Sequence, residues 1–232
     1  MKNNFLVDIL KKSNDPSLLY KKGALKMIYL NPKTYLHFRE TYYKNFGVDL
    51  IRYDGIYFVS LLKFLCGYKY GRNSFDFTSL ADKFFKTVKE NNESIEIYGG
   101  SDDEITKFIN FIREKYQGIN ITDYDNGFKN NEFYQNKISL SSSNNILIGL
   151  GSIKQEEVVL NSVFNGKLIT CGAFISQTAN SDDGIYYPIF YKKFGILLLY
   201  RIITEKGHWK RLPYYPKFTF YFIKDLIRYY LS

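Results

Sequence analysis

Apolar residues along this chain follow two different periods. Short runs of consecutive apolar residues, typical of buried strands, alternate with longer segments in which apolar residues recur every three or four positions, as in amphipathic helices. The pattern predicts strands at residues 24–31, 48–55, 94–100, 119–125, 145–151 and 167–174. It predicts helices at residues 32–46, 55–67, 80–92 and 101–116, and another after residue 151. Such alternation is typical of an α/β fold, with a mostly parallel sheet and helices on both faces.

Local signals support two of these helix starts. Pro32 suits the first turn of a helix, because the N–H that it lacks would have no partner there. Ser101 is followed by three acidic residues, which is typical of an N-cap and a first helical turn. Ligands of parallel sheets bind beyond the carboxyl ends of the strands, where several glycines of this chain fall. The stretch at 139–145, rich in serine and asparagine, is expected to be a loop.

Composition indicates a folded protein. The chain has 232 residues, of which 45% are hydrophobic and 19% aromatic, so it can bury a sizeable core. The first residues are too polar for the core of a signal peptide, and the longest apolar run, at 194–200, is far shorter than the ~20 residues that span a bilayer. We therefore expect a protein that is neither secreted through a visible signal nor transmembrane.

The residues that most often bind zinc or form disulfides are sparse. Cys66 and Cys171 both lie in apolar surroundings, which is typical of buried thiols in a reducing compartment. His37 and His208 are far apart and have no Cys or His near them at a ligand spacing. We expect no disulfide and assign no metal site.

The positive charge is concentrated at the C-terminal end. The chain carries a net charge of +9, and residues 188–232 contain nine basic and two acidic residues, a net of +7. A segment this basic and this aromatic suits nucleic acid, an anionic membrane or an anionic ligand of the domain itself. A solvated pair of terminal helices is the commoner structure for such charge runs.

One turn in the middle of the chain has the form of a phosphate site. At residues 146–156 a strand runs into Gly149-Leu150-Gly151 and then into the start of a helix, so that backbone N–H groups can point at an anion. The turn lacks the third glycine of a dinucleotide fingerprint and the Gly-Lys-Ser/Thr of a P-loop. From these residues alone, a turn that serves only packing is the commoner explanation.

Several stretches, taken in order, resemble the motifs of the WecG/TagA/CpsF glycosyltransferases, glycosyltransferase family 26. Residues 149–156 read Gly-Leu-Gly-Ser-Ile-Lys-Gln-Glu, similar to the family signature Gly-x-Gly-x-Pro-x-Gln-Glu. Residues 29–32 resemble a strand-end Thr-x-Asn, and residues 53–56 an Asp-Gly-Ile/Val motif. Residues 171–174 match Gly-Gly-Ala-Phe, and residues 188–211 resemble the stretch Ala-Pro … Gly-Leu-Glu-Trp-x-x-Arg-Leu and the basic residues after it.

The chain departs from the family pattern at several positions. Tyr29 stands where the family has Thr, Ile153 where it has Pro, and Ile175 where it commonly has Asp after Gly-Ala-Phe. Leu197 and Leu198 replace Glu-Trp. These departures bear on the identity of donor and acceptor more than on the reaction type.

The resemblance implies an inverting glycosyltransferase. Members of the family transfer a sugar from a UDP-sugar to a polyprenyl-diphosphate-linked sugar in the synthesis of bacterial surface polysaccharides such as teichoic acid, capsule or enterobacterial common antigen. They work as peripheral membrane proteins at the inner face of the cell membrane, and the resemblance implies no metal and no cofactor. The sugar implied here is a hexose or an N-acetylhexosamine of the N-acetylmannosamine type.

Inversion in one displacement needs a base for the acceptor hydroxyl and positive charge for the departing diphosphate. Asp54 is the candidate base, since it follows an apolar strand and precedes Gly55; an N-cap of the next helix is the alternative role. Arg72, at the place of a family arginine, and Arg201 are the candidates for the diphosphate, because a guanidinium fork suits phosphate oxygens.

The remaining candidates are binding residues. The amide of Asn31 can bind sugar hydroxyls, although Asn before Pro is also a common turn. Gln155 lies in the first turn of a helix, where Glu156 is either a second contact or a partner of the helix dipole. The full set expected to bind substrate is Asn31, Gly149, Gly151, Gln155, Glu156, Gly172, Lys210 and Arg211.

Two regions are expected. Residues 1–187 would form a Rossmann-like catalytic domain that binds the nucleotide sugar, and residues 188–232 a basic, aromatic, helical appendage that completes the active site and contacts an anionic membrane. A homo-oligomer is left open. Two alternatives are a nucleic-acid-binding module, disfavoured because the charge is confined to the C-terminal segment, and a relative that binds nucleotide sugars without catalysis.

Overall fold

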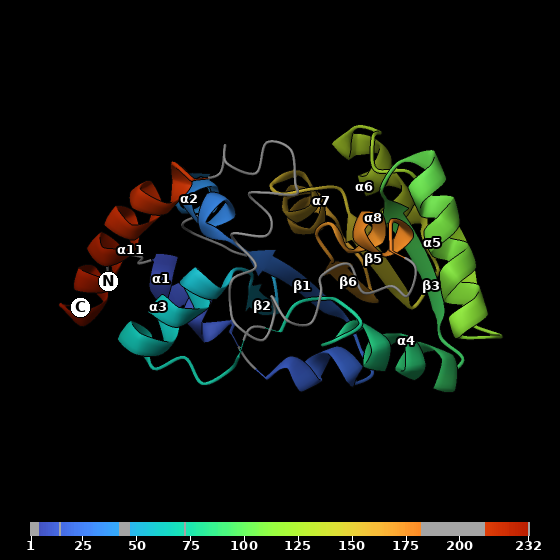
Figure 1. Cartoon of the computed structure of the whole chain (residues 1–232), viewed down its shortest axis with the longest axis horizontal. Helices are drawn as coiled ribbons and strands as arrows, with labels where there is room; N and C mark the ends of the chain where they lie inside the picture. The colour runs from blue at the N-terminus through green and yellow to red at the C-terminus, as the bar shows by residue number, and fades with distance from the viewer. Residues whose placement is uncertain (1–4, 14, 42–46, 72, 182–211, 232) are drawn as a thin grey trace.

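A six-stranded parallel sheet forms the centre of the molecule (Figure 1). The computed structural model describes residues 5–13, 15–41, 47–71, 73–181 and 212–231. The strands lie in the order β2-β1-β6-β5-β3-β4, and every neighbouring pair is parallel. Their bounds are β1 (Leu25–Leu30), β2 (Leu50–Tyr53), β3 (Ser94–Gly99), β4 (Asn120–Asp125), β5 (Asn145–Gly149) and β6 (Lys167–Thr170). The predicted α/β class with a parallel sheet is confirmed.

Helices cover both faces of the sheet. One face packs on α1 (Phe5–Lys11), α2 (Pro32–Thr41), α3 (Ile56–Cys66), α6 (Asn131–Leu140), α7 (Lys154–Asn161) and α11 (Tyr214–Tyr230). The other face packs on the 3-10 helix η1 (Pro16–Tyr20), α4 (Ala81–Glu90), α5 (Asp102–Lys115) and α8 (Phe174–Ala179). Alternate residues of one strand serve the two faces: Ile28 lies in the first core and Met27 in the second. This period of two is what a strand buried on both sides requires.

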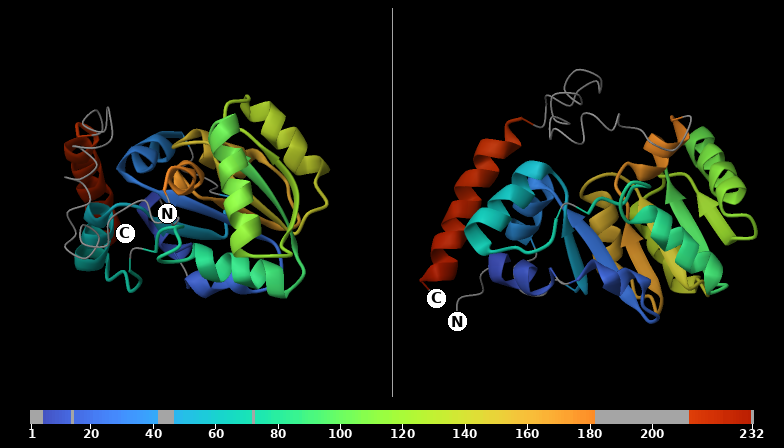
Figure 2. Two further views of the ribbon diagram at one scale, coloured as in Figure 1. Left: turned by 45° about the vertical axis from the view of Figure 1, so that its right-hand side comes forward. Right: turned by 60° about the horizontal axis from the view of Figure 1, so that its bottom comes forward.

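The connections change direction between β3 and β5. The chain leaves β3 through α5 on one face and leaves β5 through α7 on the other, although these strands are neighbours. In open parallel sheets, ligands bind outside the carboxyl ends of strands at such a switch in direction. Figure 2 shows the two helices on opposite sides of the sheet. The topology therefore makes the edge beyond Gly99 and Gly149 the candidate place for a binding site.

Several predicted boundaries change, mostly by one or two residues, and four elements were not predicted. The last strand ends at Thr170 and not at residue 174, because Gly172 has a φ of 63° and turns the chain into α8. Residues 42–46, predicted as the end of the helix after β1, lie outside the described residues. The loop expected from residue 139 begins only at Ser141, because α6 extends to Leu140. Helix α6 was not predicted from the apolar pattern, because only Tyr134 and Ile138 of its ten residues are buried. The others are α1, η1 and α8, all of seven residues or fewer.

The N-cap expected for α5 is confirmed. The Ser101 hydroxyl accepts a hydrogen bond from Glu104 N, and the Glu104 carboxylate accepts one from Ser101 N, which is a complete capping box. Both cysteines are free thiols; Cys171 is buried, whereas Cys66 is only half-buried. Burial raises the pKa of Cys66 to about 11 and that of Cys171 further. Within the described ranges, no helix combines the length and apolarity that a membrane crossing needs.

Helix α11 packs on the sheet domain through an apolar stripe and one ion pair. Phe218, Phe222 and Leu226 recur every four residues and join the first core. Asp225 lies in the same stripe, 3% exposed, and accepts hydrogen bonds from Arg39 Nε (2.6 Å) and Nη2 (2.8 Å). The Tyr35 hydroxyl donates to the same carboxylate at 2.8 Å. A buried charge held by three donors ties α11 to α2.

Replacement of Asp225 by Asn should weaken this attachment. The change leaves the Arg39 guanidinium without its carboxylate in a largely buried place, and loss of one partner of a buried ion pair costs roughly 3–5 kcal/mol. We expect a fall of this size in the free energy of unfolding measured in urea, together with faster proteolysis of the C-terminal segment. The control is Asp103→Asn, since the Asp103–Lys107 pair is well exposed and such pairs contribute about 1 kcal/mol or less. Equal stability of the two variants would contradict the assigned role of Asp225.

Candidate active site

Residues from distant motifs meet at the carboxyl edge of the sheet. The strand order makes β2, β1, β6 and β5 consecutive neighbours. Their ends bring together Asp54 after β2, Asn31 after β1, Gly172 after β6 and Gly149 at the end of β5. A backbone hydrogen bond of 2.8 Å from Asp54 N to Leu30 O holds the first two strand ends in register. The family-like motifs thus lie along one edge.

The turn after β5 needs its glycines. A Cβ atom on Gly149 would lie 3.0 Å from Ile175 Cδ1 and 3.1 Å from Cys171 Sγ, which leaves no room for a larger residue without rearrangement. Gly151 has a φ of 82°, a conformation that glycine adopts without strain. Gln155 N then donates to Gly151 O at 3.2 Å as the chain enters α7. Gln155 N is therefore already bonded, and binding of an anion by other backbone N–H groups of this turn stays a prediction from the sequence.

Ile153 has an unusual backbone conformation in this turn. Its φ is 80° and its ψ is −58°, and it is one of two described non-glycine residues with positive φ. Its N–H donates to Glu156 Oε2 at 2.6 Å. Proline, which the family signature has here, fixes φ near −65° and has no N–H. The turn of this chain is therefore built differently from the signature that it resembles.

Gln155 and Glu156 hold two turns together. Gln155 is 2% exposed; its Nε2 donates to Glu156 Oε1 at 2.5 Å, and its Oε1 accepts from Gly172 N at 3.2 Å. Glu156 is 1% exposed, and burial raises the pKa of its carboxyl group to about 7. Hydrogen bonds from Gln155 and from Ile153 N oppose that rise. Both side chains lie beneath the glycine turns and connect the β5 turn to the β6 turn.

Asn31 caps α2 and also reaches the neighbouring turn. Its Oδ1 accepts hydrogen bonds from Lys33 N (2.9 Å) and Thr34 N (3.1 Å), as an N-cap does. Its Nδ2 donates to Ser152 Oγ at 3.3 Å, across the sheet edge in the turn after β5. The turn role considered from sequence is thus present, and the amide nitrogen in addition faces the Gly149–Gly151 region. Ser152 was not identified from the sequence, because a serine in a turn gives no signal of its own.

Asp54 lies at the end of β2 and is not the N-cap of α3. The cap is Gly55, with a φ of 92°, and no side chain makes a capping hydrogen bond to this helix. Asp54 Oδ1 accepts from Gly55 N at 2.8 Å, and the residue is half-buried. The pKa of the Tyr29 hydroxyl is raised well above its usual value, mainly by burial and partly by the charge of Asp54, while Arg52 opposes the rise. Asp54 is therefore a half-buried carboxylate near the buried Tyr29, at the carboxyl edge of the sheet.

Two of the departures from the family pattern are buried near the site. Tyr29, 7% exposed, donates its hydroxyl proton to Asn73 O at 2.8 Å and so fastens the segment after α3. Ile175, 1% exposed, packs against the turns after β3 and β5. Its Cδ1 would lie 2.7 Å from a Cβ on Gly99. Both residues are therefore buried close to the carboxyl edge of the sheet.

The glycine pair after β3 lies beside the β5 turn and was missing from the predicted set. Gly99 is paired with Gly149 in the sheet, and a Cβ on Gly99 would lie 2.6 Å from Gly149 O. Gly100 has a φ of 70° and accepts a hydrogen bond at its carbonyl from Gly127 N. Two consecutive glycines directly after a strand are a visible signal. Their proximity to the β5 turn depends on the strand order, which the sequence pattern does not reveal.

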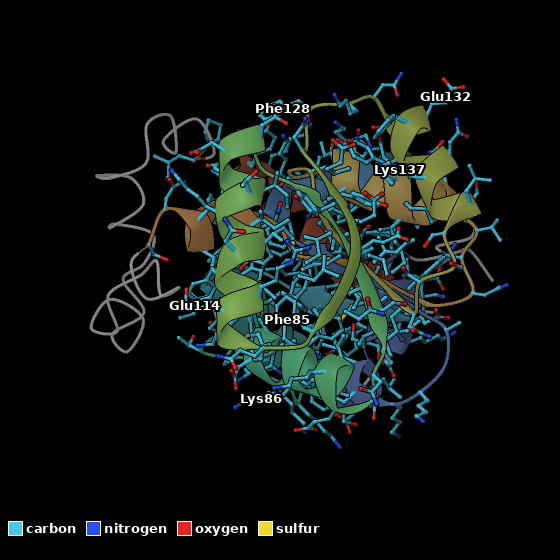
Figure 3. The ribbon with its side chains drawn as sticks, turned by 90° about the vertical axis from the view of Figure 1, so that its right-hand side faces the viewer. Phe85, Lys86, Glu114, Phe128, Glu132 and Lys137 are labelled. Atoms are coloured by element: carbon cyan, nitrogen blue, oxygen red, sulfur yellow. The ribbon has the colours of Figure 1, made fainter. Side chains whose placement is uncertain are left out.

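One Asp-x-Asp sequence, Asp123-Tyr124-Asp125, occurs at the end of β4. Its carboxylates are both bonded to Lys137, whose Nζ lies 2.8 Å from Asp123 Oδ2 and 3.2 Å from Asp125 Oδ2. Burial acts to lower the pKa of Lys137, but the hydrogen bonds to the two carboxylates outweigh it, and the pKa is raised. Figure 3, which views this end of the sheet, shows Lys137 and Glu132 on α6. Among the described side chains, no three His, Cys, Asp or Glu residues are grouped as a metal ion requires.

Several predicted site residues lie outside the described part of the chain. They are Arg72, Arg201, Lys210 and Arg211, together with the departures Leu197 and Leu198. The structure brings together Asp54, Asn31 and the glycine turns, with Gln155 and Glu156 beneath them.

The raised pKa of Glu156 predicts a pH-dependent stability. The buried carboxyl keeps its proton up to about pH 7, whereas in the unfolded chain it ionises near 4.5. Between these values the folded state binds more protons, so the free energy of unfolding falls as the pH rises, by roughly 3 kcal/mol from this group. Glu156→Gln should remove that decrease in urea unfolding measured across this range. The exposed Glu132→Gln is the control, and an unchanged pH slope in Glu156→Gln would show that Glu156 is already ionised.

Comparison with known proteins identifies the family. Residues 17–231 match the model of the Glycosyl transferase WecG/TagA/CpsF family. A UDP-Gal:alpha-D-GlcNAc-diphosphoundecaprenol beta-1,4-galactosyltransferase of Shigella boydii is 33% identical over 204 residues, which cover 85% of each chain. An N-acetylglucosaminyldiphosphoundecaprenol N-acetyl-beta-D-mannosaminyltransferase of Bacillus spizizenii is 26% identical over 146 residues, 62% of this chain and 55% of that relative. The resemblance inferred from the motifs is confirmed, and the chain belongs to the WecG/TagA/CpsF family of glycosyltransferases.

Proposed function

We propose that this glycosyltransferase moves a hexose from a UDP-sugar to an N-acetylglucosamine carried on a polyprenyl diphosphate, with inversion, in the synthesis of a bacterial surface polysaccharide. The observation that carries the proposal is the meeting of Asp54, Asn31 and the Gly149–Gly151 turn at one edge of the sheet. The galactosyltransferase relative, similar over 85% of both chains, supports a hexose over the N-acetylmannosamine also expected from sequence. Membership of the family argues against a nucleic-acid-binding module.

The donor diphosphate is assigned to the edge of the sheet beyond β3 and β5, where the connections change direction. The Gly149–Gly151 turn and the Gly99–Gly100 turn would form the floor of this site, where a Cβ on Gly99 would lie 2.6 Å from Gly149 O. Backbone N–H groups of the Gly149–Gly151 turn would face the phosphate oxygens. Gly172 would border the site on the side of β6, held there by Gln155. Gln155 and Glu156 thus serve the donor by fixing these turns.

Asp54 is assigned as the base that takes the proton of the acceptor hydroxyl. It is half-buried at a strand end, and its Oδ1 is oriented by Gly55 N. A carboxylate so placed can accept the proton as the hydroxyl attacks the anomeric carbon. Asn31 lies on the next strand, and its Nδ2 faces the same space as Ser152, where it can donate to a sugar hydroxyl.

Positive charge for the departing UDP is assigned to arginines. Arg72 and Arg201 fall in stretches that resemble the family, and a guanidinium can bind two phosphate oxygens at once. Lys210 and Arg211 would extend this cradle. In this proposal the arginines neutralise the leaving group, and no metal and no cofactor is required.

The acceptor lipid accounts for the basic, aromatic C-terminal segment. Residues 188–232 would contact the anionic inner face of the cell membrane, where each basic residue near the surface contributes about 1 kcal/mol. The same segment would bring Arg201 to the donor. A lipid-linked acceptor makes peripheral attachment useful, because the reacting hydroxyl stays close to the headgroups.

The test of the reaction is UDP release from UDP-galactose with a polyprenyl-diphosphate-linked N-acetylglucosamine. Asp54→Asn should lower turnover by a factor of ~10²–10⁴, the usual contribution of a general base, with the fold and UDP affinity unchanged. The matched control is Asp49→Asn, at the amino end of the same strand, which should turn over normally. Normal turnover in Asp54→Asn would remove Asp54 from this role, and no release by the wild type with any UDP-sugar would refute the function.

Arg201→Ala should slow the reaction even with a soluble, short-chain acceptor. Loss of one preorganised donor at a developing charge raises the barrier by ~2–4 kcal/mol. Lys224→Ala is the comparison, since Lys224 lies beyond the family-like stretch and should affect only membrane binding and its salt dependence. A silent Arg201→Ala with an impaired Lys224→Ala in the soluble assay would reverse the two roles.

A further inference from the structure

Helices α3 and α11 lie side by side and run in the same direction (Figure 2). At their N-terminal ends, the Tyr57 ring lies 5.5 Å from the Tyr215 ring, and the Tyr57 hydroxyl is 2.5 Å from Thr219 Oγ1. At their C-terminal ends, the Tyr230 hydroxyl donates to Leu65 O at 2.7 Å. The two helices therefore share a seam along their whole length.

Large apolar side chains flank this seam in contact with solvent. Phe64 lies two turns after Tyr57 on the same face of α3, and Ile223 and Ile227 lie one and two turns after Thr219 on α11. Phe64 is 88% exposed, Ile223 44% and Ile227 54%. The other exposed apolar residues of the two helices are Ile56, Tyr57, Tyr214, Phe220, Tyr229 and Tyr230, and Leu231, which directly follows α11, is exposed as well. So many exposed apolar residues on neighbouring helices mark an interaction surface.

The charges of this surface have one sign. Lys63 is exposed on α3, and Lys217, Lys224 and Arg228 are exposed on α11. Helix α3 contains no acidic residue, and the single acid of α11, Asp225, is buried against Arg39. Exposed aromatic and aliphatic side chains interleaved with lysine and arginine are the pattern of helices that lie in the interface of an anionic membrane.

We propose that α3 and α11 form one membrane-binding surface, with α3 as a full participant and not only the C-terminal segment. The proposal rests on the proposed function, since a lipid-linked acceptor gives the surface its purpose. Asp54 and Gly55 directly precede α3, so the surface begins beside the assigned base. Ile56 and Tyr57, the first two residues of α3, would then lie where the polyprenyl chain leaves the headgroups. Helix α3 begins next to Asp54, the assigned base, and thus sets the distance between the reacting hydroxyl and the bilayer.

The test is the partition of the full chain onto vesicles of phosphatidylcholine and phosphatidylglycerol in equal parts, measured by flotation without donor or acceptor. Phe64→Glu on α3 and Ile227→Glu on α11 should each lower the partition coefficient about tenfold, because each replaces an apolar contact by a repelled charge. Leu140→Glu is the matched control: Leu140 is 86% exposed at the end of α6, and its replacement should leave binding unchanged. Circular dichroism should show the same helix content in all three variants.

The proposal would be overturned if Phe64→Glu bound the vesicles as the wild type does while Ile227→Glu bound them more weakly, because α11 alone would then bind the membrane. Equal binding of the wild type to vesicles of pure phosphatidylcholine would overturn it as well. Turnover on a soluble, short-chain acceptor separates this result from the reaction itself, since Phe64→Glu should react there at the wild-type rate. A wild type that binds vesicles but transfers no sugar would refute the proposed function while leaving the surface intact.

Discussion

All six strands of the sheet run in one direction, and the site depends on that constraint. Parallel neighbours need a crossover between them, so every strand end is followed by a turn that leads toward a helix. The turns after β1, β2, β3, β5 and β6 consequently collect on one edge. Polar groups that the chain separates by more than a hundred residues, such as Asn31 and Ser152, come within hydrogen-bond distance there. The opposite edge receives only the strand starts.

The strands and most helices follow from hydrophobic periodicity, because each is long enough to show its own period. Helix α6 does not, since two buried residues in ten leave no clear amphipathic face. The early end of β6 depends on the left-handed conformation of Gly172, which composition alone does not reveal. In the site, Asp54, Asn31 and the β5 turn were recognisable as strand-end residues in family-like motifs. The position of Gly99 and Gly100 beside the β5 turn could not be recognised from the sequence, because it depends on which strands are neighbours.

Sequence also could not show how deeply Gln155 and Glu156 are buried. Both belong to a polar motif at a helix start, where exposure is the usual expectation. The structure instead places them under the turns, with the amide of Gln155 joined to Glu156 on one side and to Gly172 on the other. A buried polar pair of this kind is favourable only while its hydrogen bonds are kept. These hydrogen bonds thereby fix the distance between the turn after β5 and the turn after β6.

Ile153 gives the signature-like turn a backbone conformation that the proline of the family signature could not adopt. Its N–H forms the hydrogen bond to Glu156 that a proline would lack, and its φ of 80° is closed to the proline ring. Isoleucine bears the cost of a left-handed backbone here, offset by that hydrogen bond. The two residues are thus interchangeable in an alignment but not in this turn. A proline at position 153 would therefore require a different path for the whole loop, so an exchange at this position cannot be made by the side chain alone.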